Sequence, residues 1–149
     1  MGNPGIYIAA VKAAVTQESY LWATMEGIVR VVLVDGSPIV RQSLSRMLSR
    51  IEGVEVVGEA AMAQQVARAI AAYRPDVVVL DIWLPDGSAL PWLPQWTNRQ
   101  PAPIFLVMTG RVSEPLKRAC LQGGAKYFFD KSSQLDEFLE TIRNLATGQ

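Results

Sequence analysis

The 149-residue chain contains no histidine and only one cysteine, Cys120. Without histidine, zinc sites and Ser-His or Cys-His catalysis are excluded, and one cysteine cannot form an intramolecular disulfide. The 14 Lys and Arg balance 14 Asp and Glu, so no surplus of positive charge is present for wrapping nucleic acid. No apolar run reaches the roughly 18 residues that cross a bilayer. We therefore expect a cytoplasmic domain with no membrane segment and no direct contact with DNA.

The first 28 residues differ from the rest because they contain only three charged side chains. Residues 1–5 lack the Lys or Arg that precedes the apolar run of a signal peptide, so secretion is not predicted. The Ala-rich stretch 6–15 favours either a helix that docks on a partner chain or an extension without function, with translation beginning at Met25. The predicted organisation is an N-terminal extension over residues 1–28 and one domain over residues 29–149.

From Val29 onward, short apolar runs alternate with helical periodicity. The run 29–34 is almost uninterrupted, as expected of a parallel strand that is buried on both faces. Ser37 can cap a helix that begins at Pro38 and continues until Gly53. Further strands are predicted at 54–59, 77–80, 104–108 and 127–130, and further helices at 63–73, 114–122 and 134–146. Five such units predict an α/β fold, a three-layer αβα sandwich around a parallel five-stranded sheet.

One crossover is less regular than the others. Pro91 fits the first turn of a helix capped by Ser88, but Pro94 would cost about 3 kcal/mol inside one. We therefore predict a short or distorted helix. Trp92 and Trp96 lie in the same segment, and they either pack against the sheet or form a patch that binds a partner.

Four polar residues follow the predicted strands at the point where each strand ends. They are Asp35, Asp81, Thr109 and Lys131. Ligands of such sheets bind beyond the carboxyl ends of the strands, so these side chains are expected to converge. A carboxylate there can attack a phosphoryl group if a cation and hydrogen-bond donors neutralise the oxygens. Asp81 suits the acceptor, Lys131 the cation and Thr109 the hydroxyl donor.

Four stretches around these residues form a longer pattern. They are VVLVDGSPIVR at 31–41, PDVVVLDIWLPDG at 75–87, MTG at 108–110 and GAKYFFDK at 124–131. In this order and spacing they resemble the receiver domain of two-component response regulators, the chemotaxis-regulator-like family, over about residues 29–147.

The resemblance implies a flavodoxin-like (βα)5 fold with strand order 2-1-3-4-5. It implies that Asp81 accepts a phosphoryl group from a phosphohistidine, carried by a sensor histidine kinase or a phosphotransfer protein. It also implies that Thr109 and Lys131 contact the phosphoryl oxygens, and that Thr109 and Phe128 form the conformational switch. The chain would then be a phosphoprotein of a signalling system and not an enzyme.

The family also uses Mg²⁺, and here the sequence departs from its pattern. The resemblance assigns the metal to Asp35, Asp81 and the backbone carbonyl of Trp83, but Gly36 stands where the family has a second acid. Loss of a carboxylate would weaken the magnesium site. The alternative function is therefore a degenerate receiver, a protein-interaction module that works without phosphorylation. Trp83 is bulky for its place and either shields the phosphoryl group from water or packs on the loop.

Other interpretations concern surfaces and output. A flavin- or nucleotide-binding enzyme on this fold would need a glycine-rich phosphate loop after the first strand, which is missing. Arg41, Arg46 and Arg50 either meet an acidic partner or form the solvated face of their helix. Residues 53–60 resemble receivers of the nitrate-regulator type, which act in transcription regulation. No helix-turn-helix follows, so we expect a stand-alone receiver or one cut from a longer regulator, with a homodimer as a further option.

Overall fold

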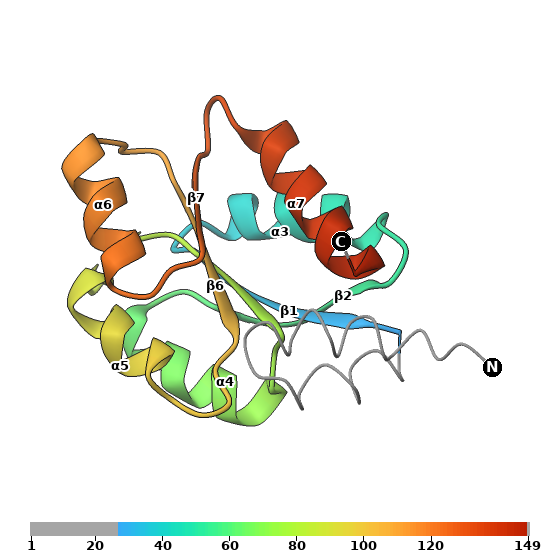
Figure 1. Ribbon diagram of the computed structural model, residues 1–149, viewed down its shortest axis with the longest axis horizontal. Coiled ribbons are helices and arrows are strands. Elements are labelled where there is room, and N and C mark those ends of the chain that lie inside the picture. Colours follow the sequence, from blue (N-terminus) through green and yellow to red (C-terminus); the bar gives the residue numbers. More distant parts are fainter. Residues whose placement is uncertain (1–26, 149) are drawn as a thin grey trace.

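The computed structural model describes residues 27–148 and contains a central sheet of five parallel strands (Figure 1). The strands are β1 (Val29–Val34), β2 (Val54–Ala60), β3 (Val77–Leu80), β6 (Ile104–Thr109) and β7 (Tyr127–Asp130). They lie in the order β2-β1-β3-β6-β7, and every neighbouring pair is parallel. The predicted order 2-1-3-4-5 and the flavodoxin-like fold are confirmed.

Helices cover both faces of this sheet. They are α3 (Pro38–Ser49), η1 (Ala63–Gln65), α4 (Val66–Tyr73), η2 (Leu90–Trp92), α5 (Leu93–Thr97), α6 (Glu114–Gln122) and α7 (Leu135–Thr147). Helices α3 and α7 lie on one face, and α4 and α5 lie on the other (Figure 1). Helix α6 packs its buried side chains into the same layer as α4 and α5.

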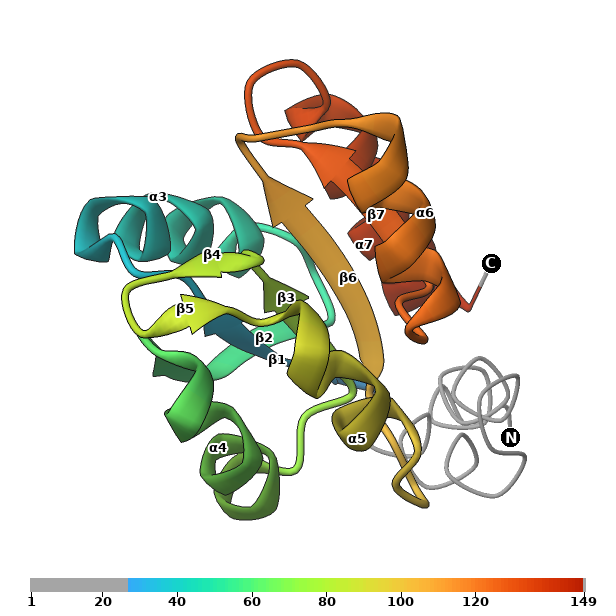
Figure 2. The same cartoon turned by 90° about the vertical axis from the view of Figure 1, so that its left-hand side faces the viewer.

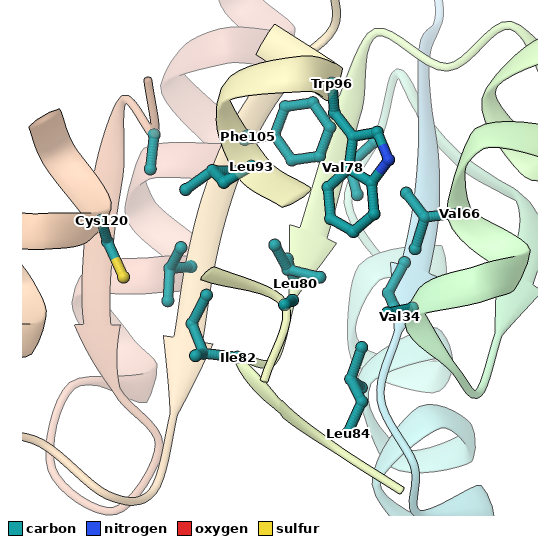
Figure 3. Close-up of a cluster of buried hydrophobic side chains, with 14 of the residues drawn as sticks. Val34, Val66, Val78, Leu80, Ile82, Leu84, Leu93, Trp96, Phe105 and Cys120 are labelled. Carbon is teal, nitrogen blue, oxygen red and sulfur yellow. The ribbon is translucent and has the colours of Figure 1, made fainter. Parts of the chain in front are cut away.

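Each face of the sheet has its own buried cluster because successive strand residues point in opposite directions. Val32 and Val34 of β1 pack toward α4, α5 and α6, whereas Val31 and Leu33 pack toward α3 and α7. Figure 3 shows the first of these clusters, which also contains Cys120. Burial raises the pKa of this thiol to about 11. The cysteine is therefore a core residue that stays protonated at neutral pH.

The start of α3 forms as the sequence predicts. The Ser37 hydroxyl accepts a hydrogen bond from the Val40 amide at 3.2 Å, and Pro38 occupies the first turn. The helix ends at Ser49, earlier than predicted, and a turn leads to Gly53, whose φ of +83° is in the left-handed region that glycine adopts readily.

The irregular crossover contains short helices, as predicted. Pro91 and Pro94 each occupy a first-turn position, one in η2 and the other in α5. A proline in a first turn lacks only an amide that would have no helical partner, so two short helices accommodate both rings. Trp96 is 3% exposed and stacks on Phe105, with ring centroids 6.0 Å apart, which confirms packing for this residue. Trp92 is 48% exposed.

An unpredicted hairpin follows β3. Strands β4 (Trp83–Leu84) and β5 (Gly87–Ser88) pair antiparallel, and the hairpin lies beside the start of α3 (Figure 2). Asp86 in its turn accepts hydrogen bonds from the Ala63 and Gln64 amides of η1 at 2.8 and 3.0 Å. These backbone donors lower the pKa of the Asp86 carboxyl, the Ala63 amide most of all. The hairpin is thereby attached to the body of the domain.

The proposed N-terminal extension lies almost entirely outside the described residues, as do the possible helix at 6–15 and the possible start at Met25. Within residues 27–148, no helix has the length and apolar character needed to span a membrane.

Candidate functional site

A cavity of about 500 Å³ opens where the strands reach their carboxyl ends. Its charged lining residues are Asp35, Asp81, Arg111 and Lys131. The β4–β5 hairpin and the Gly36–Ser37 segment complete the walls. Three of the four polar residues predicted to converge therefore line one cavity, and Thr109 ends the strand between β3 and β7.

Lys131 joins the two carboxylates. Its Nζ donates to Asp35 Oδ2 at 2.5 Å and to Asp81 Oδ2 at 2.7 Å. Both aspartates are buried, and a buried carboxylate pair is costly without a cation between them. Burial by itself would lower the pKa of Lys131, but the hydrogen bonds and attraction from both aspartates raise it above its ordinary value. The ammonium is thus charged at neutral pH, and it holds the carboxylates side by side.

The remaining carboxylate oxygens are oriented by local backbone amides. Asp35 Oδ1 accepts from the Ser37 amide at 2.9 Å, and Asp81 Oδ1 accepts from the Trp83 amide at 3.1 Å. Each contact spans two residues, so the turn after each strand fixes the carboxylate that begins it. The two aspartates are therefore held in defined orientations by the residues that follow them.

Thr109 has a fully buried side chain, and its Oγ1 has no hydrogen-bond partner among the described residues. A buried hydroxyl without a partner costs roughly 1–3 kcal/mol. A backbone hydrogen bond links the end of β6 to the residue after β7, because the Lys131 amide donates to the Thr109 carbonyl at 2.9 Å. The Thr109 hydroxyl is thus an unpaired donor at the end of β6, although Thr109 is not among the residues that line the cavity.

Phe128, the predicted partner of Thr109 in the switch, lies on β7 opposite Val107 of β6. It is 8% exposed and belongs to the buried cluster beneath α4, α5 and α6. The structure therefore places Thr109 and Phe128 on adjacent strands, with the aromatic ring packed inward.

The sequence interpretation of Arg41 was wrong. This side chain is neither a solvated arginine nor free for a partner, because it is largely buried against the end of β1. Its Nη1 donates to the Asp35 carbonyl at 2.5 Å, and its Nε pairs with Glu59 at 2.7 Å. Arg46, on the same helix, and Arg50, directly after its end, are exposed.

Gly36 is covered by the hairpin. A Cβ atom built on Gly36 would lie 2.7 Å from Cδ and 2.9 Å from Cγ of Pro85. Real Cβ atoms are essentially never found this close to another heavy atom. The room in which the family's second acid would begin is therefore taken by the proline ring.

Trp83 and Arg111 stand together at the mouth of the cavity. The guanidinium carbon of Arg111 is 5.8 Å from the centroid of the Trp83 ring, a cation–π contact, and Trp83 is 42% exposed. Sequence reasoning gave no site role to Arg111, Glu59 or Pro85, and it gave Arg41 a different one. Arg41 and Pro85 lie within the quoted stretches, but the contacts of all four residues depend on separate segments coming together.

The oxygen ligands present suit Mg²⁺, with one carboxylate fewer than in the family's pattern. Within residues 27–148, no group of three or more His, Cys, Asp or Glu side chains is placed to hold a metal ion. Mg²⁺ nevertheless binds to one or two carboxylates together with waters and a phosphate. Asp35 and Asp81 supply two adjacent carboxylates, and the Trp83 carbonyl is the predicted third ligand. Lys131 already pairs with both carboxylates, so the ion would compete with its ammonium.

Sequence comparison finds the response regulator receiver domain over residues 31–143. Response regulator GacA of Pseudomonas aeruginosa is 31% identical over 121 residues, which are 81% of this chain and 56% of that protein. A protein-glutamate methylesterase/protein-glutamine glutaminase of Xanthomonas campestris is 37% identical over 80% of this chain and 35% of its own length. The chain therefore spans about half or less of the curated relatives that it matches.

Solved structures show the same similarity. A LuxR-family two-component response regulator from Aurantimonas has a TM-score of 0.74 and 30% identity, covering 82% of this chain and 87% of that one. The signal receiver domain of the regulator NarL from Mycobacterium tuberculosis has a TM-score of 0.73 and 29% identity, covering 82% and 98%.

Proposed function

The chain belongs to the response regulator receiver domain family, and from this premise we propose that Asp81 accepts a phosphoryl group in two-component signalling. The donor is a phosphohistidine of a sensor histidine kinase or of a phosphotransfer protein. The chain acts as a phosphoacceptor and is not itself an enzyme with a turnover substrate. One observation carries the proposal: a single ammonium, Lys131, bridges two buried carboxylates that line the cavity.

The transfer needs a nucleophile and neutralisation of the phosphoryl oxygens. An Asp81 carboxylate oxygen forms the new P–O bond while the P–N bond of the phosphohistidine breaks, and the electron pair of that bond returns to the imidazole nitrogen. Lys131 then transfers one of its hydrogen bonds from Asp81 to a phosphoryl oxygen, and it stays anchored through Asp35. Magnesium, when held by Asp35, Asp81 and the Trp83 carbonyl, supplies further charge neutralisation.

The response to phosphorylation would run through Thr109. Its unpartnered Oγ1 gains a hydrogen bond when a phosphoryl oxygen comes within reach, so the phosphorylated state is favoured by a contact that the resting state lacks. Phe128, on the adjacent strand, is the predicted second part of the switch.

We expect the surface changed by phosphorylation to bind a partner, such as a second copy of the chain. Relatives of the LuxR family favour a role in transcription regulation, in which this chain contributes the receiver.

A second candidate is the degenerate receiver, which binds its partner regardless of phosphate. It is favoured by one observation, the proline ring that fills the space beside Gly36. With that space filled, Asp35 and Asp81 are the only carboxylates among residues 27–148 that line the cavity and could hold magnesium.

Phosphoryl uptake distinguishes the two candidates. The protein is incubated with acetyl phosphate and magnesium and then measured by intact mass. We expect wild type to gain about 80 Da per chain and Asp81→Asn to gain nothing. Asp136→Asn, the same change at an exposed position of α7, is the matched control and should be labelled like wild type. Uptake that survives in Asp81→Asn would contradict the acceptor assignment. No uptake in wild type would favour the degenerate receiver.

A further inference from the structure

The cavity contains two cations as well as two carboxylates. Lys131 lies between Asp35 and Asp81, and Arg111 lines the same cavity from the segment that follows β6. The charges of these four side chains cancel. A phosphoryl group on Asp81 adds negative charge, so the occupied site needs more positive charge than one lysine provides.

The hairpin after β3 connects the loss of an acid with the position of Arg111. Its Pro85 ring lies over Gly36, while its Trp83 ring lies against the Arg111 guanidinium. Asp86 in the same turn is bonded to two amides of η1. One attached segment thus excludes a carboxylate on one side of the cavity and holds a cation on the other.

The charges of the two arrangements can be compared directly. In the family's usual pattern, a second acid contributes one negative charge and a divalent metal contributes two positive charges, which together give one net positive charge. Arg111 also contributes one positive charge, and it does so without a metal. A guanidinium presents several N–H donors in a plane, a geometry that suits phosphoryl oxygens.

We infer that Arg111 is the second cation of the phosphoryl site and replaces the charge otherwise supplied by the second acid and its metal. This inference rests on the proposed function and specifies it further: the cavity takes a phosphoryl group with little dependence on magnesium. The guanidinium leaves the Trp83 ring or tilts across it to donate to a phosphoryl oxygen. Arg111 changes no bonds of its own. The new P–O bond forms at Asp81, the bond between phosphorus and the leaving group of the donor breaks, and the leaving group takes the electron pair of that bond.

The test measures metal dependence in two ways. Acetyl phosphate labelling is followed by intact mass in excess EDTA and in millimolar magnesium. Binding of beryllium fluoride, a phosphoryl mimic, is measured separately as a rise in melting temperature under the same two conditions. The variants are Arg111→Ala and Arg111→Lys, and Arg118→Ala on the exposed side of α6 is the matched control.

Wild type should label in EDTA at a rate within about tenfold of that in magnesium. Arg111→Ala should lose about 10- to 100-fold of the metal-free rate, the effect of removing one charged hydrogen bond, and should bind beryllium fluoride more weakly in EDTA. Arg111→Lys should recover part of the metal-free labelling rate and part of the affinity for beryllium fluoride. Arg118→Ala should match wild type in both measurements.

Two results would overturn the inference while the proposed function stands. The first is that wild type becomes labelled only when magnesium is present. The second is that Arg111→Ala is labelled in EDTA as fast as the control Arg118→Ala. Failure of wild type to label or to bind beryllium fluoride under either condition would remove the proposed function and this inference together.

Discussion

The contact between Gly36 and Pro85 predicts whether Gly36→Ala raises or lowers the stability of the domain, because one steric clash decides the outcome. Gly36 does not have a positive φ, so alanine suits its backbone. At such a position, Gly→Ala normally stabilises a protein by about 0.4–1 kcal/mol, because the unfolded chain loses freedom. Here the new Cβ would lie 2.7 and 2.9 Å from two atoms of the proline ring. Overpacking of this kind costs about 1–3 kcal/mol.

We therefore expect Gly36→Ala to be destabilising by about 1–2 kcal/mol. At roughly 3–6 °C per kcal/mol for a domain of this size, the melting temperature should fall by several degrees. The same change at Gly110 is the control, since a Cβ there meets nothing within 4 Å and that glycine also lacks a positive φ. Gly110→Ala should be neutral or stabilising.

A double-mutant cycle isolates the cause. In a Pro85→Ala background the ring atoms Cγ and Cδ are gone, so Gly36→Ala should become neutral or stabilising by up to about 1 kcal/mol. Urea unfolding of the four proteins gives the coupling energy. If Gly36→Ala is as well tolerated as Gly110→Ala in the wild-type background, the ring moves aside at no cost and the reasoning about the excluded acid fails.

Two further predictions concern the polar residues of the site. The pKa of Lys131 is raised in the folded state, so its ion pairs contribute fully below the unfolded-state pKa of about 10.4, and the contribution is lost as pH rises through the folded-state pKa. The stability difference between wild type and Lys131→Met, measured by urea unfolding, should be constant from about pH 7 to 9 and shrink above about pH 10.5; a difference that does not shrink would refute the ion pairs. Thr109→Val removes a buried hydroxyl without a partner and should raise stability by about 1 kcal/mol while lowering phosphoryl uptake; a loss of stability would mean that the hydroxyl is satisfied in the resting protein.

The strands were predictable because their sequence signals are local, whereas the order of the sheet came from the family resemblance. The run Val77–Leu80 is apolar at every position, and a strand buried on both faces requires this. Ser37 and Pro38 predicted the start of α3 for the same reason, since a cap and a first-turn proline act within a few residues. The convergence of Asp35, Asp81 and Lys131 followed from the rule that parallel strands end at one edge.

The contacts between loops were not predictable in this way. The β4–β5 hairpin has only two residues per strand, too few for an alternating pattern to show. Arg41 lies on a helix whose other arginine, Arg46, is exposed, and nothing in its spacing indicates that it reaches the Asp35 carbonyl. Arg111 meets Trp83 across separate loops. Such contacts depend on the tertiary positions of both partners, and single-sequence periodicity carries no information on them.

The filled space beside Gly36 bears on how the missing acid should be understood. A site that had merely lost a carboxylate would keep the room that the side chain occupied, and restoring aspartate there would restore the ligand. Here the ring of Pro85 takes that room, so Gly36→Asp must displace the hairpin before a carboxylate can reach the cavity. The same displacement would disturb Trp83 and its contact with Arg111. Gly36→Asp therefore does not rebuild the family's usual pocket in isolation, and its effect on phosphoryl uptake has to be read together with Pro85→Ala.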